Sequence, residues 1–97
     1  MNGIIEEAIQ NKKIIQFSYK GELRIVEPYA YGVSSKSNDI LRAYQVEGGS
    51  SSSNDLGWRL FTVNKIENLI TLDDKFEPTR DGYNPEDSAM VEIYITA

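Results

Sequence analysis

The sequence predicts a small, mainly β domain with one N-terminal helix, curled into a strongly bent barrel. Short runs of β-branched and aromatic residues recur along the chain and are separated by turn residues. One stretch near the N-terminus has the apolar spacing of a helix instead. Because 97 residues suffice for one domain with a modest core, residues 1–97 are expected to fold as a single unit.

The helix is predicted over residues 4–11. Asn2 stands where an N-cap is expected, and Glu6 and Glu7 fall in the first turn, where acidic side chains are favourable. Asn11 is expected to close the helix. The apolar stripe consists of Ile4, Ile5, Ala8 and Ile9. Because so short a helix is unstable alone, it must pack on the strands.

The barrel is predicted over residues 14–72. Its strands are expected at residues 14–19, 23–27, 39–46, 58–63 and 66–72, with extended chain at 29–33 and turns at 20–22, 34–38 and 64–65. Pro28 is expected to end the second strand because it cannot donate a ladder hydrogen bond. The Gly- and Ser-rich stretch 47–57 is expected to be a plain hairpin linker.

The C-terminal third is predicted to be an acidic irregular tail over residues 73–90, followed by a final strand over 91–96. Phe76 and Tyr83 are expected to pin the tail to the domain. In the final strand, alternation places Val91, Ile93 and Ile95 on the inward face. The tail carboxylates match no calcium-loop spacing, so they predict a solvated face and no metal site.

Missing residue types and the charge narrow the function. The chain has no Cys and no His, which excludes thiolate nucleophiles, zinc–thiolate sites and Ser-His-Asp triads, and predicts a non-enzymatic protein without a cofactor. The net charge of −5 divides into +1 over residues 1–65 and −6 over residues 66–97, which disfavours binding of long duplex DNA by this chain alone. No apolar run approaches the roughly 20 residues of a membrane helix, and no secretion signal opens the chain, so a cytoplasmic protein without a membrane partner is expected.

Three strand arginines are the candidate ligand-binding residues. Arg24, Arg42 and Arg59 lie on the second, third and fourth predicted strands and are expected to converge on one outer face or at the barrel mouth. Arginine suits a bidentate grip on phosphate or carboxylate. Nearby aromatic side chains suited to stacking on a base are Tyr31, Tyr44 and Trp58. The alternative is ordinary structure: solvated or cross-strand paired arginines, and aromatic side chains that pack in the core or at its rim.

The order of several sequence pieces resembles the WYL domain, from about residue 4 to residue 76. The pieces are Ile5-Glu6-Glu7-Ala8-Ile9, Lys13 to Tyr19, Arg24-Ile25-Val26-Glu27-Pro28, Leu41-Arg42-Ala43-Tyr44, and Trp58-Arg59-Leu60-Phe61 followed by Lys65-Ile66. The tripeptide that names the family falls at Asp39-Ile40-Leu41, where two of its three residues differ.

This resemblance implies an Sm-like, SH3-type small β-barrel that serves as a ligand-sensing or regulatory module. Members of the family occur in bacterial and phage regulators and are linked to nucleotide or nucleic-acid ligands, and a free-standing, divergent member is expected here. The family's anionic pocket maps onto Arg24, Arg42 and Arg59. The predicted ligand is a nucleotide, a signalling oligonucleotide or a short single strand. A protein-interaction domain remains the alternative, with the acidic tail or a barrel edge docking a partner or a second copy.

Overall fold

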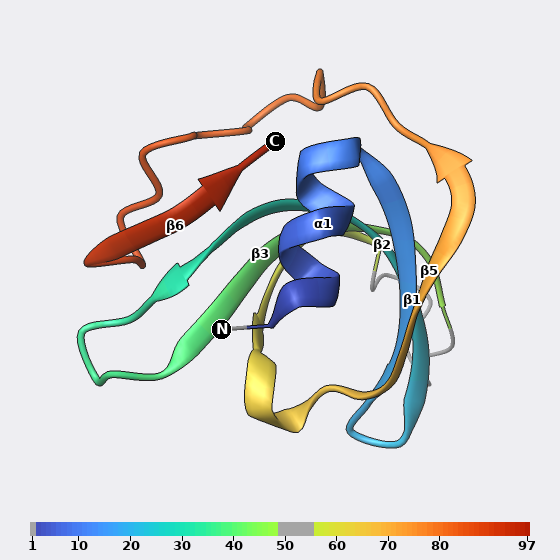
Figure 1. Ribbon diagram of the computed structural model, residues 1–97, viewed down its shortest axis with the longest axis horizontal. Helices are drawn as coiled ribbons and strands as arrows, with labels where there is room; N and C mark the ends of the chain where they lie inside the picture. The colour runs from blue at the N-terminus through green and yellow to red at the C-terminus, as the bar shows by residue number, and fades with distance from the viewer. Residues whose placement is uncertain (1, 49–55) are drawn as a thin grey trace.

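The computed structural model describes residues 2–48 and 56–97. Its elements are α1 (Gly3–Asn11), β1 (Lys13–Tyr19), β2 (Glu22–Val33), β3 (Asp39–Gly48), β4 (Gly57–Thr62), the 3-10 helix η1 (Val63–Lys65), β5 (Glu67–Lys75) and β6 (Glu92–Thr96) (Figure 1). The prediction of a mainly β fold with one N-terminal helix is confirmed. Most of the predicted linker, residues 49–55, lies outside the described residues.

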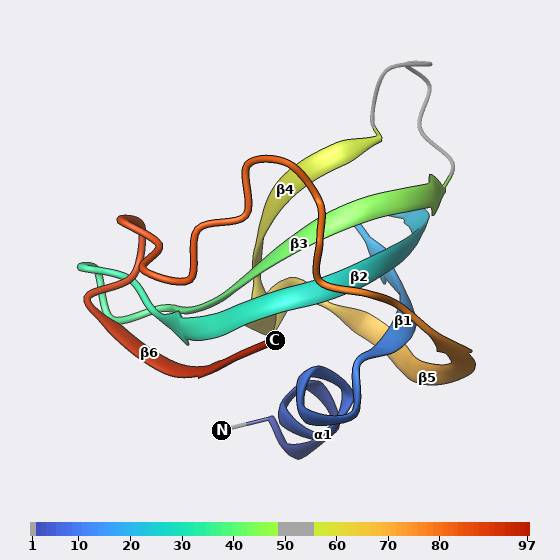
Figure 2. The ribbon, with the colours of Figure 1, turned by 90° about the horizontal axis from the view of Figure 1, so that it is seen from above.

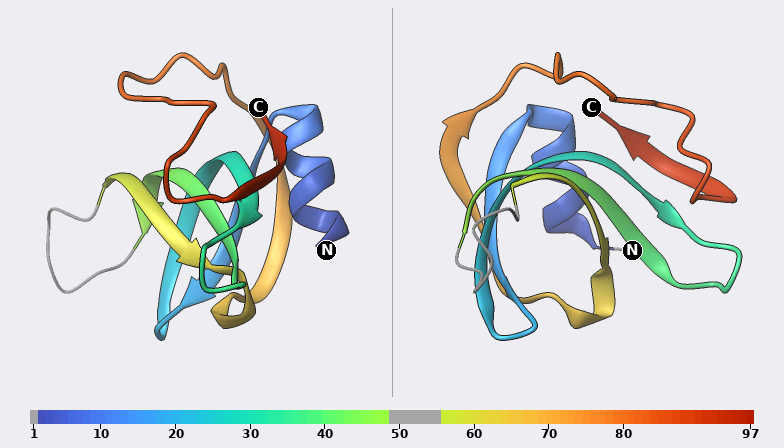
Figure 3. Two further views of the ribbon diagram at one scale, coloured as in Figure 1. Left: turned by 90° about the vertical axis from the view of Figure 1, so that its left-hand side faces the viewer. Right: turned by 180° about the vertical axis from the view of Figure 1, so that it is seen from behind.

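The strands form one antiparallel sheet in the order β4-β3-β2-β1-β5, with β6 paired to the end of β2. The strands curl strongly (Figure 3), yet no ladder joins β4 to β5 among the described residues. The sheet is therefore strongly bent, as expected, but it remains open and does not form the predicted barrel. The 3-10 helix η1 connects β4, at one edge of the sheet, to β5, which pairs with β1 at the other edge.

Helix α1 begins as the sequence predicts. The Asn2 side chain accepts hydrogen bonds from the backbone N–H groups of Ile4 and Ile5 at 3.0 and 3.1 Å, which satisfies two of the free donors at the helix start. Lys12, with left-handed φ of 56°, closes the helix in place of Asn11. Ile4 is 47% exposed and does not belong to the buried stripe. No helix in the described part of the chain has the length and apolar character needed to span a membrane.

Strand β2 continues through Pro28, which the sequence analysis expected to end it. The register shifts between Pro28, opposite Ala43, and Ala30, opposite Arg42, so Tyr29 is an extra residue in a bulge. A bulge tolerates a residue that lacks a backbone N–H, which is why the strand survives the proline. As a consequence, Tyr29 and Ala30 are both fully buried although they are neighbours in a strand.

The sheet is covered on both faces. The face that we call inner carries the main core and is closed by α1; its buried residues include Ile5, Ile9, Ile15, Phe17, Val26, Tyr31, Leu41, Ala43 and Phe61. The opposite, outer face of β2, β3 and β4 is covered by residues 76–91, here called the C-terminal segment. Figure 2 shows this segment and α1 on opposite sides of the sheet.

The C-terminal segment is irregular and pinned by aromatic side chains, as predicted. Strand β5 extends to Lys75, so the segment begins at Phe76 and not at residue 73. The rings of Phe76 and Tyr83 lie 5.2 and 4.7 Å from the ring of Tyr29, between ring centres. The two predicted anchor residues therefore pack on the residue that the β2 bulge turns outward.

Strand β6 does not alternate as predicted. It begins at Glu92, and Val91 is 69% exposed instead of inward-facing. The register shifts between Ile95, opposite Tyr31, and Ile93, opposite Gly32, so Ile95 packs on the inner core while Ile93 packs in a separate outer cluster with Met90. Gly32 permits this close approach, since a Cβ there would collide with the backbone oxygen of Glu92.

Candidate functional site

Arg24 lies on the inner face of the sheet, which otherwise carries mostly apolar side chains. It pairs with Phe17 across β1 and is only 8% exposed. Its Nη1 donates to Gln45 Oε1 at 3.2 Å, and its Nη2 reaches the Tyr19 carbonyl at 3.5 Å. Nη2 also forms an ion pair with Glu22 Oε2, at 3.5 Å. The guanidinium is thus buried with long contacts to its neighbours.

Two buried donors at this place have no acceptor. The Nε of Arg24 and the Nε2 of Gln45 are both buried and make no hydrogen bond to residues 2–48 or 56–97. Gln45 is fully buried and faces Val26, so it belongs to the inner face as well. An unsatisfied buried donor costs about 1–3 kcal/mol, and more when it is charged. The two side chains are in contact through the Arg24–Gln45 hydrogen bond, so both donors lie in the same small region of the inner face.

Arg59 shares this face. It pairs with Ala43 and is separated by one residue from Phe61, and both of these side chains belong to the inner core. Gly57 stands opposite Gln45, so Arg59 is the diagonal cross-strand neighbour of Gln45. The glycine adds no side chain beside the amide. Arg24, Gln45 and Arg59 therefore form the inner-face polar site, at the end of the sheet where β3 leads toward β4.

Arg42 lies on the other face of the sheet, so the expectation that the three arginines converge on one face is wrong. Its neighbours Leu41 and Ala43 point into the inner core, which turns Arg42 outward. There it forms a bidentate ion pair with Asp87, with Nε to Oδ2 at 2.6 Å and Nη2 to Oδ1 at 3.2 Å. These hydrogen bonds lower the pKa of Asp87 from its ordinary value, against the effect of burial.

Two of the predicted stacking residues, Tyr44 and Trp58, lie on the outer face of the sheet together with Arg42. Side chains and backbone of the C-terminal segment contact both of them. The Trp58 indole donates to the Asp81 carbonyl at 2.7 Å and stacks on Tyr83, with ring centres 6.3 Å apart and planes at 17°. Tyr44 contacts the edge of Trp58, and the Arg80 guanidinium lies 4.3 Å from its ring centre. Both aromatic side chains therefore pack within the domain.

A buried carboxylate holds the start of the C-terminal segment. Glu27 is 6% exposed and forms a bidentate pair with Arg80, at 3.0 and 3.2 Å. It also accepts a hydrogen bond from the Tyr29 hydroxyl at 3.1 Å. Burial, then the charge of Glu27, raises the pKa of Tyr29 to about 12. Tyr29 consequently remains a protonated donor throughout the physiological pH range.

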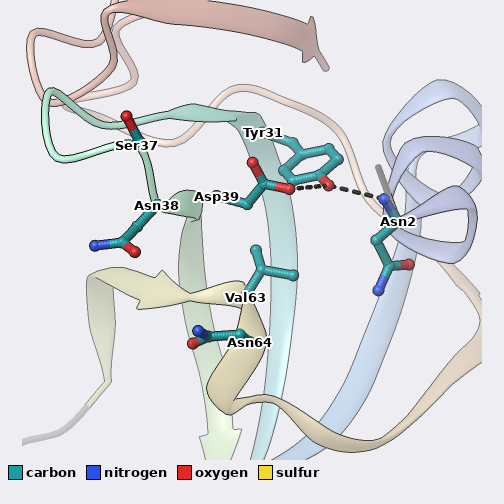
Figure 4. Close-up of a pocket in the computed structure, with 7 residues that line it drawn as sticks. All are labelled: Asn2, Tyr31, Ser37, Asn38, Asp39, Val63 and Asn64. Atoms are coloured by element: carbon teal, nitrogen blue, oxygen red, sulfur yellow. Dashed lines mark hydrogen bonds between the residues drawn. The ribbon is translucent and has the colours of Figure 1, made fainter.

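The remaining predicted residue, Tyr31, belongs to an open hollow of about 370 Å³ at the opposite end of β3. Figure 4 shows the Asp39 carboxylate beside the Tyr31 ring, with Asn2 on the far side. The Tyr31 hydroxyl donates to Asp39 Oδ2 at 3.0 Å and accepts the Asn2 N–H at 2.8 Å. Asp39 Oδ1 accepts a hydrogen bond from the Tyr94 hydroxyl at 3.1 Å. Burial raises the pKa of Tyr31 to about 12, and the charge of Asp39 adds to this.

The structure thus divides the six predicted residues into three places: Arg24 and Arg59 in the inner-face polar site, Arg42, Tyr44 and Trp58 under the C-terminal segment, and Tyr31 in the hollow. Gln45 and Asp87 were missed. A signal for Gln45 was present, because it is the polar member of the inward series Leu41, Ala43, Gln45. Nothing local marked Asp87 as the partner of a residue 45 positions away.

Together the fold and these sites define a mainly β, one-helix antiparallel domain with a polar site on its inner face. No family model, no curated protein and no solved structure matches this chain. Among the described residues, no group of three or more carboxylates gathers as ligands for a metal ion.

Proposed function

We propose that this chain is a non-enzymatic regulatory module of the WYL type, built on an Sm-like barrel, that binds the anionic part of a nucleotide, a signalling oligonucleotide or a short single strand. The bound phosphate would lie in the inner-face polar site. The resemblance in sequence, the curled antiparallel sheet and the leading helix support the assignment to this family. A cytoplasmic location accords with such a ligand.

The observation that supports the proposal is a pair of buried donors, Arg24 Nε and Gln45 Nε2, for which the described residues supply no acceptor. A phosphate oxygen accepts from both kinds of donor, and its negative charge offsets the buried guanidinium. The ion pair between Arg24 and Glu22, at 3.5 Å, is longer than the about 2.7–2.9 Å of a short charge-assisted hydrogen bond, and the Glu22 side chain is 34% exposed. Arg59 on the same face adds a second positive charge for a ligand with more than one phosphate.

The test is a thermal-shift screen with inorganic phosphate, nucleotides, cyclic oligonucleotides and short single-stranded DNA and RNA at two salt concentrations. A ligand present at 100 times its Kd should stabilise the protein by about 2.7 kcal/mol through mass action. Added salt should weaken the response, because the attraction is electrostatic. Loss of the response in Gln45→Leu, with retention in Arg42→Met, locates the site. A flat response from every probe overturns the proposal and leaves water as the occupant.

A second candidate function, pairing through a sheet edge, is favoured by strand β5. Within the described part of the chain, this strand pairs only with β1, and seven of its nine residues from Glu67 to Lys75 are exposed, Ile70 among them. In an antiparallel self-pairing centred on Thr71, Glu67 would face Lys75 of the second copy twice, which suits a homodimer.

The oligomeric state tests this second candidate. Light scattering after size exclusion should give a dimer mass that returns to a monomer mass in Lys75→Glu, since the substitution places like charges opposite each other. The matched control is Lys36→Glu, an exposed change of the same charge in the β2–β3 turn. A monomer at all concentrations contradicts edge pairing and leaves the ligand proposal untouched.

A further inference from the structure

The hollow at the start of β3 has a chemistry opposite to that of the inner-face polar site. Its lining consists of Asn2, Tyr31, Ser37, Asn38, Asp39, Val63 and Asn64, which includes one carboxylate and no Lys or Arg. Asp39 and Gln45 are six residues apart on β3, about 20 Å of extended chain. The hollow is therefore a separate site, and an anion would meet a carboxylate there.

The Asp39 carboxylate is held in place by hydrogen bonds, and no cationic side chain of the described residues pairs with it. Each oxygen accepts one hydroxyl hydrogen bond, Oδ2 from Tyr31 and Oδ1 from Tyr94. No ion pair to Asp39 forms among residues 2–48 and 56–97. A carboxylate has about four lone-pair positions, so roughly one remains on each oxygen. Two parallel acceptor positions on a fixed carboxylate match the N–H pair of a guanidinium.

The rest of the lining suits an alkyl chain that ends in such a group. Figure 4 shows the Val63 side chain directed toward Asp39, where it offers apolar contact to methylene groups. Asn38 and Asn64 lie on the same side of the hollow and are exposed, and their amide oxygens can accept further N–H donors. A volume of about 370 Å³ is enough for a small molecule or one long side chain.

We propose that this hollow binds an organic cation, an alkylguanidinium or alkylammonium group whose charged end pairs with Asp39 and whose stem lies on Val63. Such a group occurs in free amines and in the Arg and Lys side chains of proteins. The carboxylate supplies the charge, the two tyrosine hydroxyls fix its orientation, and the asparagines complete the acceptors. The site is independent of anion binding on the inner face.

The experiment is a titration of the 15N-labelled full chain with butylguanidinium and butylammonium, followed by backbone amide shifts. We expect the largest shifts at residues 37–39 and 63–64, with affinity reduced about tenfold or more in Asp39→Asn. The control Asp74→Asn removes one exposed charge on β5 and should keep the affinity within about twofold. A peptide with one central Arg distinguishes the sources: tighter binding than butylguanidinium indicates a protein side chain, and weaker binding indicates a free amine.

Because Asp39→Asn also disturbs the hydrogen bonds of Tyr31 and Tyr94, a second variant is needed. Asn38→Ala combined with Asn64→Ala changes only side chains without a hydrogen bond among the described residues, and it should weaken binding while the melting temperature stays the same. The proposal is overturned if shifts at the hollow are absent. It is equally overturned if sodium ions or glycerol produce them to the same extent, or if Asp39→Asn responds like the unchanged chain.

Discussion

Arg42 and Arg24 lie on adjacent strands of the same sheet, and their environments differ in every respect that matters for function. Arg42 faces outward, yet its guanidinium is satisfied by both oxygens of Asp87. Arg24 faces the core, is less exposed than Arg42, and has one N–H with no acceptor in the described part of the chain. Arg42, although it faces outward as a ligand-binding residue would, therefore has a structural role. Arg24, although it faces the core, is the better candidate for ligand binding.

This difference has its origin in the C-terminal segment. By covering the outer face, the segment supplies partners to the polar and aromatic side chains there: Asp87 to Arg42, Arg80 to Glu27 and Tyr83 to Trp58. In the inner-face polar site, Arg24 has partners in Gln45, Tyr19 and Glu22, but its Nε and the Nε2 of Gln45 have no hydrogen-bond acceptor among the described residues. A buried polar group is most informative when the protein itself leaves it unsatisfied, because that cost has to be offset by something else.

The largest expected effect comes from removing the side chain on which the C-terminal segment rests. Tyr29→Ala leaves a cavity at a fully buried aromatic position and should lower the free energy of unfolding by about 3–5 kcal/mol, as measured by urea denaturation. Proteolysis should cut first within residues 76–91, because Phe76 and Tyr83 lose their contact. The control Leu60→Ala, at a 42% exposed position on the same face, should cost less than about 1 kcal/mol. An uncut segment in Tyr29→Ala would contradict the anchoring role.

The second prediction tests the structural role of Arg42. Arg42→Met leaves the buried Asp87 carboxylate without its cation, and should reduce the free energy of unfolding by about 1–2 kcal/mol, since the arginine is itself 29% exposed and partly screened. The thermal shift caused by anionic ligands should remain as in the unchanged protein. If Arg42→Met loses the ligand response but keeps its stability, then Arg42 binds the ligand and the structural role assigned to it is wrong.

The third prediction is the counterpart for Arg24. Arg24→Met removes a buried guanidinium that is only partly hydrogen-bonded, so stability should change by less than about 1 kcal/mol in either direction. The stabilisation by phosphate or nucleotide should disappear, as monitored by thermal shift. The paired comparison with Arg42→Met keeps the net charge equal, so that a general loss of electrostatic attraction would affect both variants alike. An unchanged ligand response in Arg24→Met would remove the inner-face polar site from consideration.

The sequence predicted those features that depend on neighbouring residues. The Asn2 cap, the strand periods and the turn at Lys20 and Gly21, with φ of 53° and 77°, follow from local chemistry. The face of the sheet on which each arginine lies could not be predicted in this way. A charged side chain was expected to point outward, whereas Arg24 points inward and is buried. The bulges at Tyr29 and Tyr94 also escaped prediction, since each changes the alternation by one residue and depends on a partner strand. Such pairings over long sequence separation decide which candidate residues meet.

The smallest expected effect is the pH dependence of the stability that Arg42 contributes through its ion pair with Asp87. Arg42 lowers the pKa of Asp87 in the folded protein, so this pair stabilises the fold fully above the ordinary value of 3.8 and ceases to do so as the pH falls through the folded value. Urea denaturation from about pH 6 down to pH 2 should therefore show the stability difference between the unchanged protein and Arg42→Met narrowing below about pH 4. The Leu60→Ala variant, which removes no charge partner, should keep a constant difference over this range. A constant difference for Arg42→Met as well would mean that its methylene packing, and not the ion pair with Asp87, accounts for its contribution.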